Sequence, residues 1–237
     1  MGVYMKNSAK LGKFVVTFPN STEFHQLKRE IFSQHHYYLD KDFESPTIID
    51  AGAHIGLSTL YFKQTWPTAK IIAIEPNPDT VIYLQENINT NQLTDITIEP
   101  VALSTQTGRI SLYIDPTEDH WNSTASLHSK GWANTQPGKP ISVPSVPLRE
   151  FLQKPIDLLK MDIEGVEQDV LLATGSDIRQ VKHMFVEFHG RSDNHLLPIV
   201  DFLTQHQFEV SVWQNGHQTD PVKVRGLAII EGHQKNC

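Results

Sequence analysis

The sequence predicts an α/β fold built on a doubly wound, mostly parallel sheet whose C-terminal strand is antiparallel. From residue 47 onward, apolar runs of strand length alternate with stretches of helical apolar spacing, which is typical of a parallel sheet covered by helices on both faces. The last two apolar runs, residues 208–213 and 224–231, are joined by a turn that contains Gly, Asn and Pro, and such a turn predicts an antiparallel pair. A chain of 237 residues can bury one substantial core, so a single main domain is expected.

Residues 1–46 precede this alternation and are expected to form a small N-terminal cap on the main domain, residues 47–237. Residues 14–18, FVVTF, have the composition of a short strand. Asn20 can cap a helix whose apolar residues between positions 23 and 32 recur at helical spacing. The same pattern also fits a helix that merely covers an edge of the sheet.

The main domain is predicted to contain strands and helices in alternation. The strands before the final pair cover residues 47–50, 70–75, 96–103, 110–114, 141–146, 156–163 and 182–189. The helices cover residues 57–66, 78–91, 165–173 and 196–206. Pro144 interrupts one strand, and because proline has no backbone N–H to donate, this strand is expected at the edge of its sheet. Residues 115–140 are rich in turn-forming residues and predict a loop, and a loop of this length is more often functional than idle.

Composition and charge restrict the class of protein. Hydrophobic residues make up 39% of the chain and charged residues 20%, as in ordinary soluble domains. The formal net charge of −7 argues against a general nucleic-acid-binding protein, because there is no basic surplus to neutralise phosphates. The only cysteine is Cys237, so neither an internal disulfide nor a cysteine metal site is expected. No apolar run approaches the roughly 18 residues of a membrane span, and no secretory signal is evident, so we expect a cytoplasmic protein.

Four predicted strands carry an acidic residue at the carboxyl end: Asp50, Glu75, Asp162 and Glu187. The carboxyl ends of parallel strands meet at one edge of the sheet, where ligands bind in open α/β folds. Charged residues are seldom fully buried without a partner. Acids at four equivalent positions therefore predict a binding site at this edge.

A small-residue turn, residues 51–56, joins the strand that ends at Asp50 to the next helix. Such a turn places backbone N–H groups and a helix N-terminus against a nucleotide-type ligand. Its glycine spacing is G-x-x-x-G instead of the dinucleotide G-x-G-x-x-G, so a phosphate cradle is not indicated. The carboxylate of Asp50 would repel a pyrophosphate but attract an ammonium or sulfonium group. Glu75 can accept two hydrogen bonds from a ribose diol, a role found in sites for NAD and for S-adenosylmethionine.

Three stretches of the sequence resemble the FkbM family of class I S-adenosylmethionine-dependent methyltransferases. They are IIDAGAHIGLSTLYF, IIAIEPNP and IDLLKMDIEGVEQDVL. The most specific element is D-x-E-G at residues 162–165, preceded by Lys160. The resemblance covers about residues 45–190.

The resemblance implies a seven-stranded, Rossmann-like methyltransferase fold with S-adenosylmethionine as cofactor. Carried over, Glu75 binds the cofactor's ribose, and Ala102 with its two neighbours flanks the adenine. The turn after the first strand lines the methionine end, through Asp50, Gly52, Ala53, His54 and Gly56. His54 stands where many relatives have Asn, which keeps a polar side chain but leaves its partner open.

The catalytic candidates lie on the two later strands. Lys160 and Asp162 share one face of an extended strand, as does Glu164 if the strand continues, and Glu187 and His189 share a face in the same way. A lysine in an apolar run needs an acidic partner, so one interpretation is a structural pair of Lys160 with Asp162 or Glu187. The other interpretation is that these groups bind and deprotonate an acceptor hydroxyl, with His189, Glu187, Asp162 and Glu164 as candidate bases. A divalent metal on Asp162 with Glu187 or His189 is possible but not required, because the same acids suit hydrogen bonds to a polyol.

The function expected is methyl transfer to a hydroxyl oxygen of a small molecule such as a sugar or polyketide. The (D/N)-P-P-(Y/F/W) element of amino-group methylases is missing from the sequence. The loop at 115–140 carries side chains suited to an acceptor wall, namely Trp121, Asn122, Ser123, Ser126, His128 and Trp132. An ordinary surface loop with two packed tryptophans fits the same composition equally well. The alternatives are an NAD- or nucleotide-sugar-linked Rossmann enzyme and a non-catalytic cofactor-binding member of the same fold. The sequence leaves the acceptor and the oligomeric state open.

Overall fold

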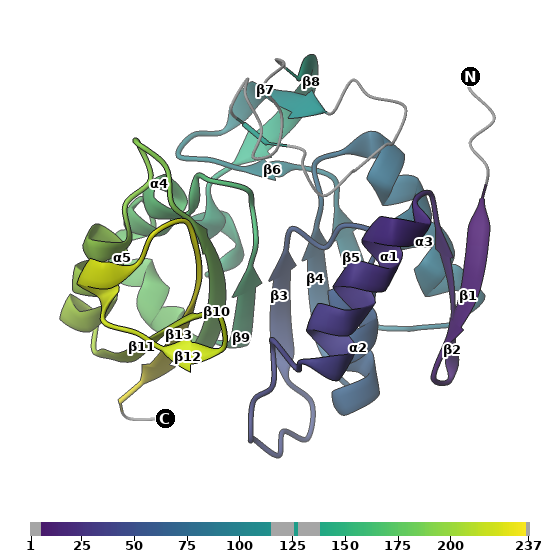
Figure 1. The fold of residues 1–237 in the computed structure, drawn as a ribbon, viewed down its shortest axis with the longest axis horizontal. Helices are drawn as coiled ribbons and strands as arrows, with labels where there is room; N and C mark the ends of the chain where they lie inside the picture. Colours follow the sequence, from purple (N-terminus) through teal and green to yellow (C-terminus); the bar gives the residue numbers. More distant parts are fainter. Residues whose placement is uncertain (1–5, 115–125, 128–137, 236–237) are drawn as a thin grey trace.

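Eight strands form the main sheet of the computed structural model, which describes residues 6–114, 126–127 and 138–235 (Figure 1). The strand order is β12-β11-β13-β10-β9-β3-β4-β5. Strands β3, β4, β5, β9 and β10 are parallel, and β13 runs antiparallel to both β10 and β11. The strands are β3 (Thr47–Ala51), β4 (Lys70–Ile74), β5 (Ile96–Glu99), β9 (Ile156–Met161), β10 (Val181–His189), β11 (Phe208–Gln214), β12 (His217–Gln218) and β13 (Leu227–Gln234). The predicted fold class is therefore confirmed, and the two-residue strand β12 is added to the seven strands expected.

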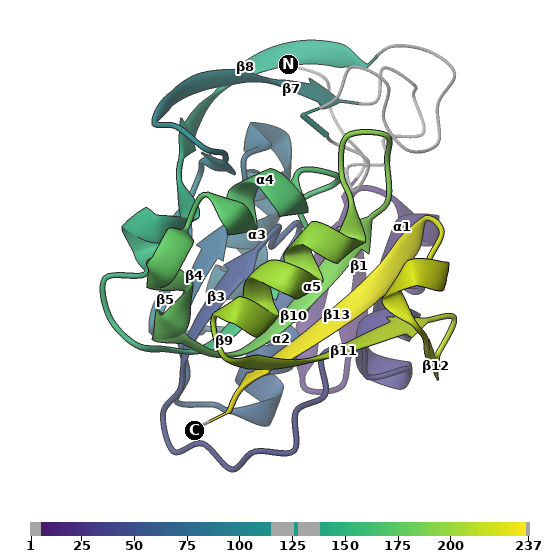
Figure 2. The same cartoon turned by 90° about the vertical axis from the view of Figure 1, so that its left-hand side faces the viewer.

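Helices cover both faces of the main sheet (Figure 2). Neighbouring side chains of β3 point to opposite faces, so Ile48 packs in one core with Leu60 of α2, and Ile49 packs in the other with Leu171 of α4. Helix α3 shares the first core and α5 the second. The helices are α2 (Leu57–Thr65), α3 (Pro78–Thr90), α4 (Glu167–Leu172) and α5 (Leu196–Gln205).

The N-terminal segment packs on the side of α2 and α3 (Figure 1). It contains the hairpin β1 (Asn7–Leu11) and β2 (Phe14–Phe18), then α1 (Ser21–Lys28) and the π-helical turn η1 (Arg29–Ser33). Asn20 caps the N-terminus of α1 as predicted, because its side chain accepts a hydrogen bond from the Glu23 N–H at 3.0 Å. Asn87 of α3 bonds both backbone groups of Thr17 in β2, at 2.7 and 3.0 Å. Phe24 shares the α2 core, and the domain division at residue 46 stays a prediction.

A separate three-stranded sheet lies over the carboxyl ends of the main strands (Figure 1). The prediction of one strand over 96–103 is wrong: β5 ends at Glu99, Pro100 follows, and the chain enters this second sheet as β6. The prediction that the strand containing Pro144 lies at an edge is also wrong, because β8 is the central strand. Pairing of β8 with β6 begins only at Ser145, so β6 needs no hydrogen bond from the missing N–H of Pro144. The strands are β6 (Ala102–Leu103), β7 (Gly108–Ile114) and β8 (Lys139–Val146).

The segment between β9 and α4 is irregular. Strand β9 ends at Met161, and Glu164 and Gly165 have positive φ angles of 61° and 102°. Glu164 therefore does not continue the strand, and the helix begins at Glu167, two residues later than predicted. Three 3₁₀ turns complete the described elements: η3 (Leu148–Phe151), η4 (Gly175–Gln180) and η5 (Pro221–Lys223). Within the described ranges, no helix is long and apolar enough to cross a membrane.

Candidate active site

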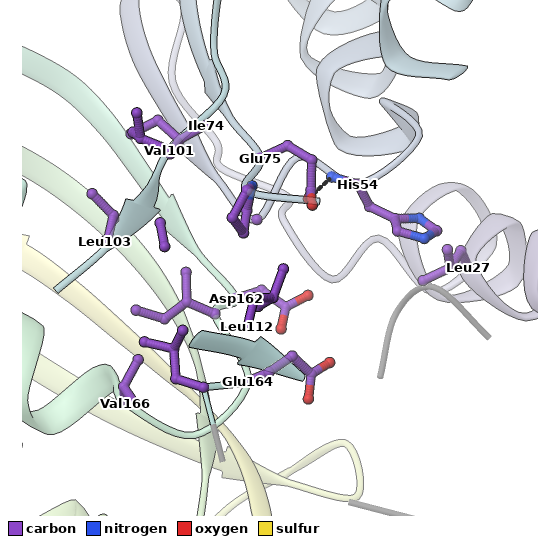
Figure 3. Close-up of a pocket in the computed structure, with 15 residues that line it drawn as sticks. Leu27, His54, Ile74, Glu75, Val101, Leu103, Leu112, Asp162, Glu164 and Val166 are labelled. Carbon is purple, nitrogen blue, oxygen red and sulfur yellow. Dashed lines mark hydrogen bonds between the residues drawn. The ribbon is translucent and has the colours of Figure 1, made fainter. Parts of the chain in front are cut away.

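A pocket of about 670 Å³ opens at the carboxyl ends of β3, β4 and β9, and Ala102, Leu103 and Leu112 of the three-stranded sheet also line it. Apolar side chains gather on one side of it, while the carboxylates of Asp162 and Glu164 point to the other (Figure 3). A second space of about 390 Å³ shares Gly52, His54 and Asp162 with the first, and also Leu27 of α1. The two spaces together form one cleft, which we call the acidic cleft.

The turn after β3 lies against the end of β9. A Cβ atom added to Gly52, which has a φ of +75°, would lie 1.7 Å from the backbone oxygen of Asp162, so only glycine fits at this junction. Gly56 has a φ of +96°, and its added Cβ would lie 2.8 Å from Leu84 Cδ1. Ala53 and His54 line the smaller space. The turn is thus formed by the residues that the sequence singled out.

Asp50 is fully buried and does not line the cleft. Its carboxylate accepts hydrogen bonds from the hydroxyls of Ser58, at 2.8 and 3.0 Å, and Thr59, at 2.6 Å. Lys160 Nζ lies 3.6 Å from it. Asp50 therefore ties β3 to the first turn of α2, and its role in binding the cofactor stays a prediction.

Glu75 lies on the cleft wall at the end of β4. Its two carboxylate oxygens accept hydrogen bonds from the N–H groups of His54 and Asn77, both at 2.9 Å, and Figure 3 shows the bond from His54. Burial raises the pKa of the Glu75 carboxyl above its usual value. Ala102 and its neighbours Val101 and Leu103 form an apolar wall beside it. The predicted ribose and adenine positions therefore share one pocket.

Lys160 is buried beneath the glycine turn, with 2% of its side chain exposed. Its Nζ donates hydrogen bonds to the carbonyl oxygens of Gly52 at 2.6 Å and Ala51 at 3.2 Å, and lies 3.8 Å from Asp162. Burial alone would lower the pKa of Lys160, but the negative charges of Asp162 and Asp50 raise it above its usual value. The proposed pair with Asp162 is present, and the lysine also fixes the turn.

Glu187 lines the smaller space and accepts a hydrogen bond from the buried hydroxyl of Tyr37. Burial and the negative charge of Asp162 raise the pKa of Glu187 to about 7. The Tyr37 ring also lies 5.7 Å from Lys160 Nζ. Tyr37, which the sequence analysis did not single out, therefore brings the N-terminal segment into contact with the candidate catalytic groups.

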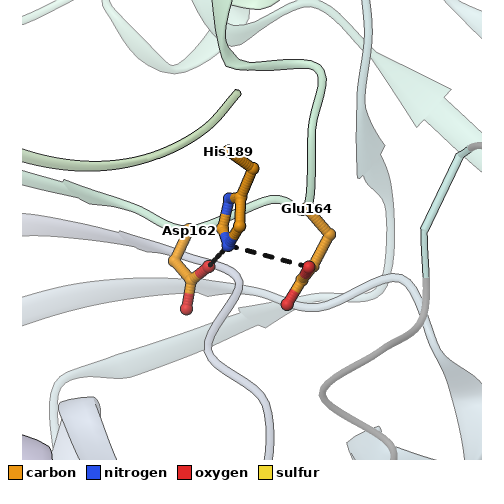
Figure 4. Close-up of side chains that lie close together, drawn as sticks. All are labelled: Asp162, Glu164 and His189. Carbon is orange, nitrogen blue, oxygen red and sulfur yellow. Dashed lines mark ion pairs between the residues drawn. The ribbon is translucent and has the colours of Figure 1, made fainter. Parts of the chain in front are cut away.

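His189 is buried, and its imidazole faces the carboxylates of Asp162 and Glu164 (Figure 4). Its Nε2 lies 3.8 Å from Asp162 Oδ1 and 3.7 Å from Glu164 Oε2, while Nδ1 lies 3.0 Å from Glu167 Oε1. Burial opposes charge on His189, but the hydrogen bond with Glu167 and the neighbouring carboxylates raise its pKa to about 10. Burial raises the pKa of Glu164 well above its usual value, despite the opposing effect of His189.

Asp162, Glu164 and His189 each offer one ligand atom within 4.8 Å of the others. The sequence predicted a metal, if any, on Asp162 with Glu187 or His189, and the geometric group contains Glu164 in the place of Glu187. Two carboxylates and one imidazole are suitable ligands for a divalent cation. Metal binding stays a prediction.

The sequence analysis missed Glu167. Its only sequence signal is a third acid shortly after the D-x-E-G element, which resembles an ordinary acid in the first turn of a helix. Of the predicted acceptor wall, Trp121, Asn122, Ser123, His128 and Trp132 lie outside the described residues. Ser126 is described, and its hydroxyl donates to the backbone oxygen of Glu164 at 2.8 Å.

The strand order, the glycine turn and the acid-lined edge define the fold of a class I methyltransferase. Among solved structures, the FkbM methyltransferase from Methylobacillus flagellatus matches with 18% identity and a TM-score of 0.57, over 82% of this chain and 45% of that one. TYW2 from M. jannaschii, solved in complex with AdoMet, matches with 13% identity and a TM-score of 0.51, over 98% of this chain and 87% of that one. A model of the methyltransferase FkbM domain matches residues 50–210. The chain belongs to the FkbM methyltransferase family, as the three motifs predicted.

Curated relatives carry methyltransferase names. Methyltransferase sdnD of Sordaria araneosa is 33% identical, over 60% of this chain and 66% of that protein, so the match spans just under two thirds of the relative. The 2-O-methyltransferase NoeI of Sinorhizobium fredii is 25% identical over 79% of each chain. The hexuronic acid methyltransferase AglP of Haloferax volcanii is 29% identical, over 65% of this chain and 61% of that protein.

Proposed function

We propose that this protein is an S-adenosylmethionine-dependent methyltransferase that methylates a hydroxyl oxygen of a small-molecule acceptor. The observation that carries the proposal is the acidic cleft, where a glycine turn, Glu75 and the D-x-E-G acids meet at one edge of a class I methyltransferase sheet. Membership of the FkbM family supports it. So does the likeness in fold to TYW2, whose structure contains AdoMet.

The cleft has separate surfaces for each part of this cofactor. Glu75 would accept hydrogen bonds from the ribose hydroxyls, beside the apolar wall of residues 101–103 that would hold the adenine. The turn of Gly52, Ala53 and His54 would hold the methionine part in the smaller space. The surrounding carboxylates favour the positive charges of an ammonium and a sulfonium group. When bound, S-adenosylmethionine supplies an electrophilic methyl group.

The acceptor side is formed by Asp162, Glu164, Glu187 and His189. Methyl transfer forms a carbon–oxygen bond as the sulfur–carbon bond breaks, so most of the catalysis can come from holding the hydroxyl in line. Closely spaced carboxylates and an imidazole suit the hydroxyls of a polyol. The names 2-O-methyltransferase for NoeI and hexuronic acid methyltransferase for AglP favour oxygen of a sugar, and a polyketide hydroxyl suits the same groups.

Glu187 fits the role of base better than His189 does. A base works best when its pKa lies near the operating pH, and the pKa of Glu187 is about 7. With a pKa of about 10, His189 is charged at neutral pH and would donate a hydrogen bond. In this scheme Glu187 takes the hydroxyl proton, and His189 orients the acceptor.

Thermal shift with S-adenosylhomocysteine and with NAD tests the proposal against the alternatives. Stabilisation by S-adenosylhomocysteine alone is expected, and stabilisation by NAD alone would favour a nicotinamide-linked enzyme. A panel of sugar, polyketide and phenolic acceptors with labelled cofactor then separates an enzyme from a non-catalytic member. Dialysis against EDTA tests the metal: full activity without metal, unchanged by added Mg²⁺, would exclude a catalytic cation at Asp162, Glu164 and His189.

A cytoplasmic location remains part of the proposal.

A further inference from the structure

We propose that Glu167 is a positioning residue of the reaction centre, which orients the His189 imidazole and shapes the turn that carries Glu164. The inference rests on the proposed function for its catalytic consequence. The orientation itself rests only on the geometry. Glu167 has 0% of its surface exposed, against 7% for His189, so it acts through other groups and does not touch an acceptor.

The carboxylate of Glu167 accepts hydrogen bonds from three separate segments. Oε1 accepts from the N–H of Gly165 at 2.9 Å and lies 3.0 Å from His189 Nδ1. Oε2 accepts from Asn194 Nδ2 at 2.6 Å. Both carboxylate oxygens therefore have partners: Oε1 contacts β10 and the turn before α4, and Oε2 contacts the segment that leads to α5.

Asn194 fixes the same network from the other side. Its Nδ2 also donates to the backbone oxygen of His189 at 2.6 Å, and its Oδ1 accepts from the N–H of Gln168 at 3.0 Å. Asn194 is itself buried, with 1% exposed. His189 is thus held at both its side chain and its backbone, which leaves the ring little freedom to rotate.

The bond at Nδ1 determines which ring nitrogen of His189 faces Asp162 and Glu164. An imidazole has two nitrogens, and the partner of one decides the role of the other. Because Nδ1 meets Glu167, Nε2 is the nitrogen directed between Asp162 and Glu164 (Figure 4). A ring flipped about χ2 would turn a carbon edge toward these acids and the acceptor.

The bond to Gly165 carries the second part of the proposal. Glu164 and Gly165 both have positive φ angles, a conformation that is unfavourable for a non-glycine residue such as Glu164. The Glu167 carboxylate holds the Gly165 N–H and so supports this turn. One buried acid therefore sets the position of both His189 and Glu164.

The test compares Glu167→Ala and Glu167→Gln with a matched control, Asp157→Asn. Asp157 is also on the main sheet and accepts hydrogen bonds from the Thr47 N–H at 2.8 Å and Lys182 at 2.7 Å, at the start of β9 and away from the cleft. Glu167→Ala is expected to lower kcat about 100-fold, the effect of a misplaced catalytic group, while KM for S-adenosylmethionine and Kd for S-adenosylhomocysteine change less than about threefold. Glu167→Gln keeps an acceptor for Nδ1 and is expected to recover roughly tenfold of the loss. The control keeps its kcat.

A spectroscopic measurement tests the orientation without turnover. In protein with ¹⁵N-labelled histidine, the His189 ring signals, assigned with His189→Asn, should show an Nδ1 proton bonded to a carboxylate. This signal should shift in Glu167→Gln and not in the control. Unchanged ring signals would overturn the orientation. An unchanged kcat, or a kcat loss matched by an equal loss of S-adenosylhomocysteine affinity, would overturn its catalytic consequence. If the unaltered protein binds no S-adenosylhomocysteine and methylates nothing, the proposed function fails, while the ring signals still decide the role of Glu167. If Glu167→Ala does not fold, Glu167→Gln carries the comparison.

Discussion

Replacing Glu75 by alanine should weaken both the fold and the binding of S-adenosylhomocysteine. The carboxylate accepts the N–H groups of His54 and Asn77, both at 2.9 Å, and Glu75 is 6% exposed. Its loss leaves two buried donors without their acceptor, at about 1–3 kcal/mol each. Because water can enter the vacated space, we expect the free energy of unfolding to fall by roughly 2–4 kcal/mol.

The effect on the ligand is separate from the effect on stability. If Glu75 binds the ribose, the variant also loses charge-assisted hydrogen bonds worth about 1.5–3 kcal/mol, which corresponds to a rise in Kd of about 10- to 150-fold. Isothermal titration calorimetry with S-adenosylhomocysteine measures the rise, and urea unfolding shows that the variant is folded under the same conditions. Glu99→Gln is the matched control, because Glu99 ends the neighbouring strand β5 and lines neither space of the cleft.

An unchanged Kd in folded Glu75→Ala would remove Glu75 from the ribose. An equal loss of affinity in Glu99→Gln would show that the effect is a general consequence of lost negative charge. Glu75→Gln should fall between, because its amide oxygen can still accept one of the two N–H groups while its NH₂ group opposes the other.

Three further outcomes are expected. With Glu187 as the base, kcat/KM should rise with pH through about 7 and then level. Glu187→Gln should lose this rise. A Glu187→Gln variant that keeps the wild-type pH profile would exclude Glu187 as the base. Gly52→Ala should abolish S-adenosylhomocysteine binding and lower Tm, because the added Cβ would lie 1.7 Å from a backbone oxygen. The control Gly108→Ala should leave both the binding and Tm unchanged, because its added Cβ meets nothing within 4 Å. Burial and His233 lower the pKa of His183 from 6.5 to about 4. Between these values the unfolded chain binds a proton that the folded chain does not, so the free energy of unfolding should fall as pH drops from 6.5 towards 4. Urea unfolding across this range should show a flatter pH dependence of this free energy in His183→Phe.

Local patterns were sufficient to predict the frame of the site. The alternation of strands and helices, the glycine turn and the acids at strand ends depend on periodicity and on a few short-range rules. These features place Gly52, Glu75 and Asp162 at one edge of the sheet without any information on tertiary contacts. The final antiparallel pair followed from its turn residues in the same way.

The features that sequence reasoning missed depend on contacts between distant segments. Tyr37 meets Glu187 across 150 positions of sequence, and no local pattern marks that pairing. Glu167 has the composition of a helix start, so its burial became visible only with the position of β10. Pro144 predicts an edge strand because proline lacks the backbone N–H that a central strand donates. The prediction fails because β8 pairs with β6 only from Ser145 onward. In each case, the tertiary partner decided what a side chain does.

On the proposed function, the contact between Gly52 and Asp162 limits how the protein can acquire a new acceptor. The Asp162 N–H also donates to the Ala51 oxygen at 3.0 Å, so the wall of the donor pocket and the first acceptor-side acid are joined by backbone. Remodelling either strand end would disturb both substrates together. Variation in acceptor choice should therefore arise in segments that reach the cleft independently of this junction. Leu27 from the N-terminal segment and Leu112 from β7 line it in this way. Libraries for altered specificity belong at those two positions, with the junction left intact.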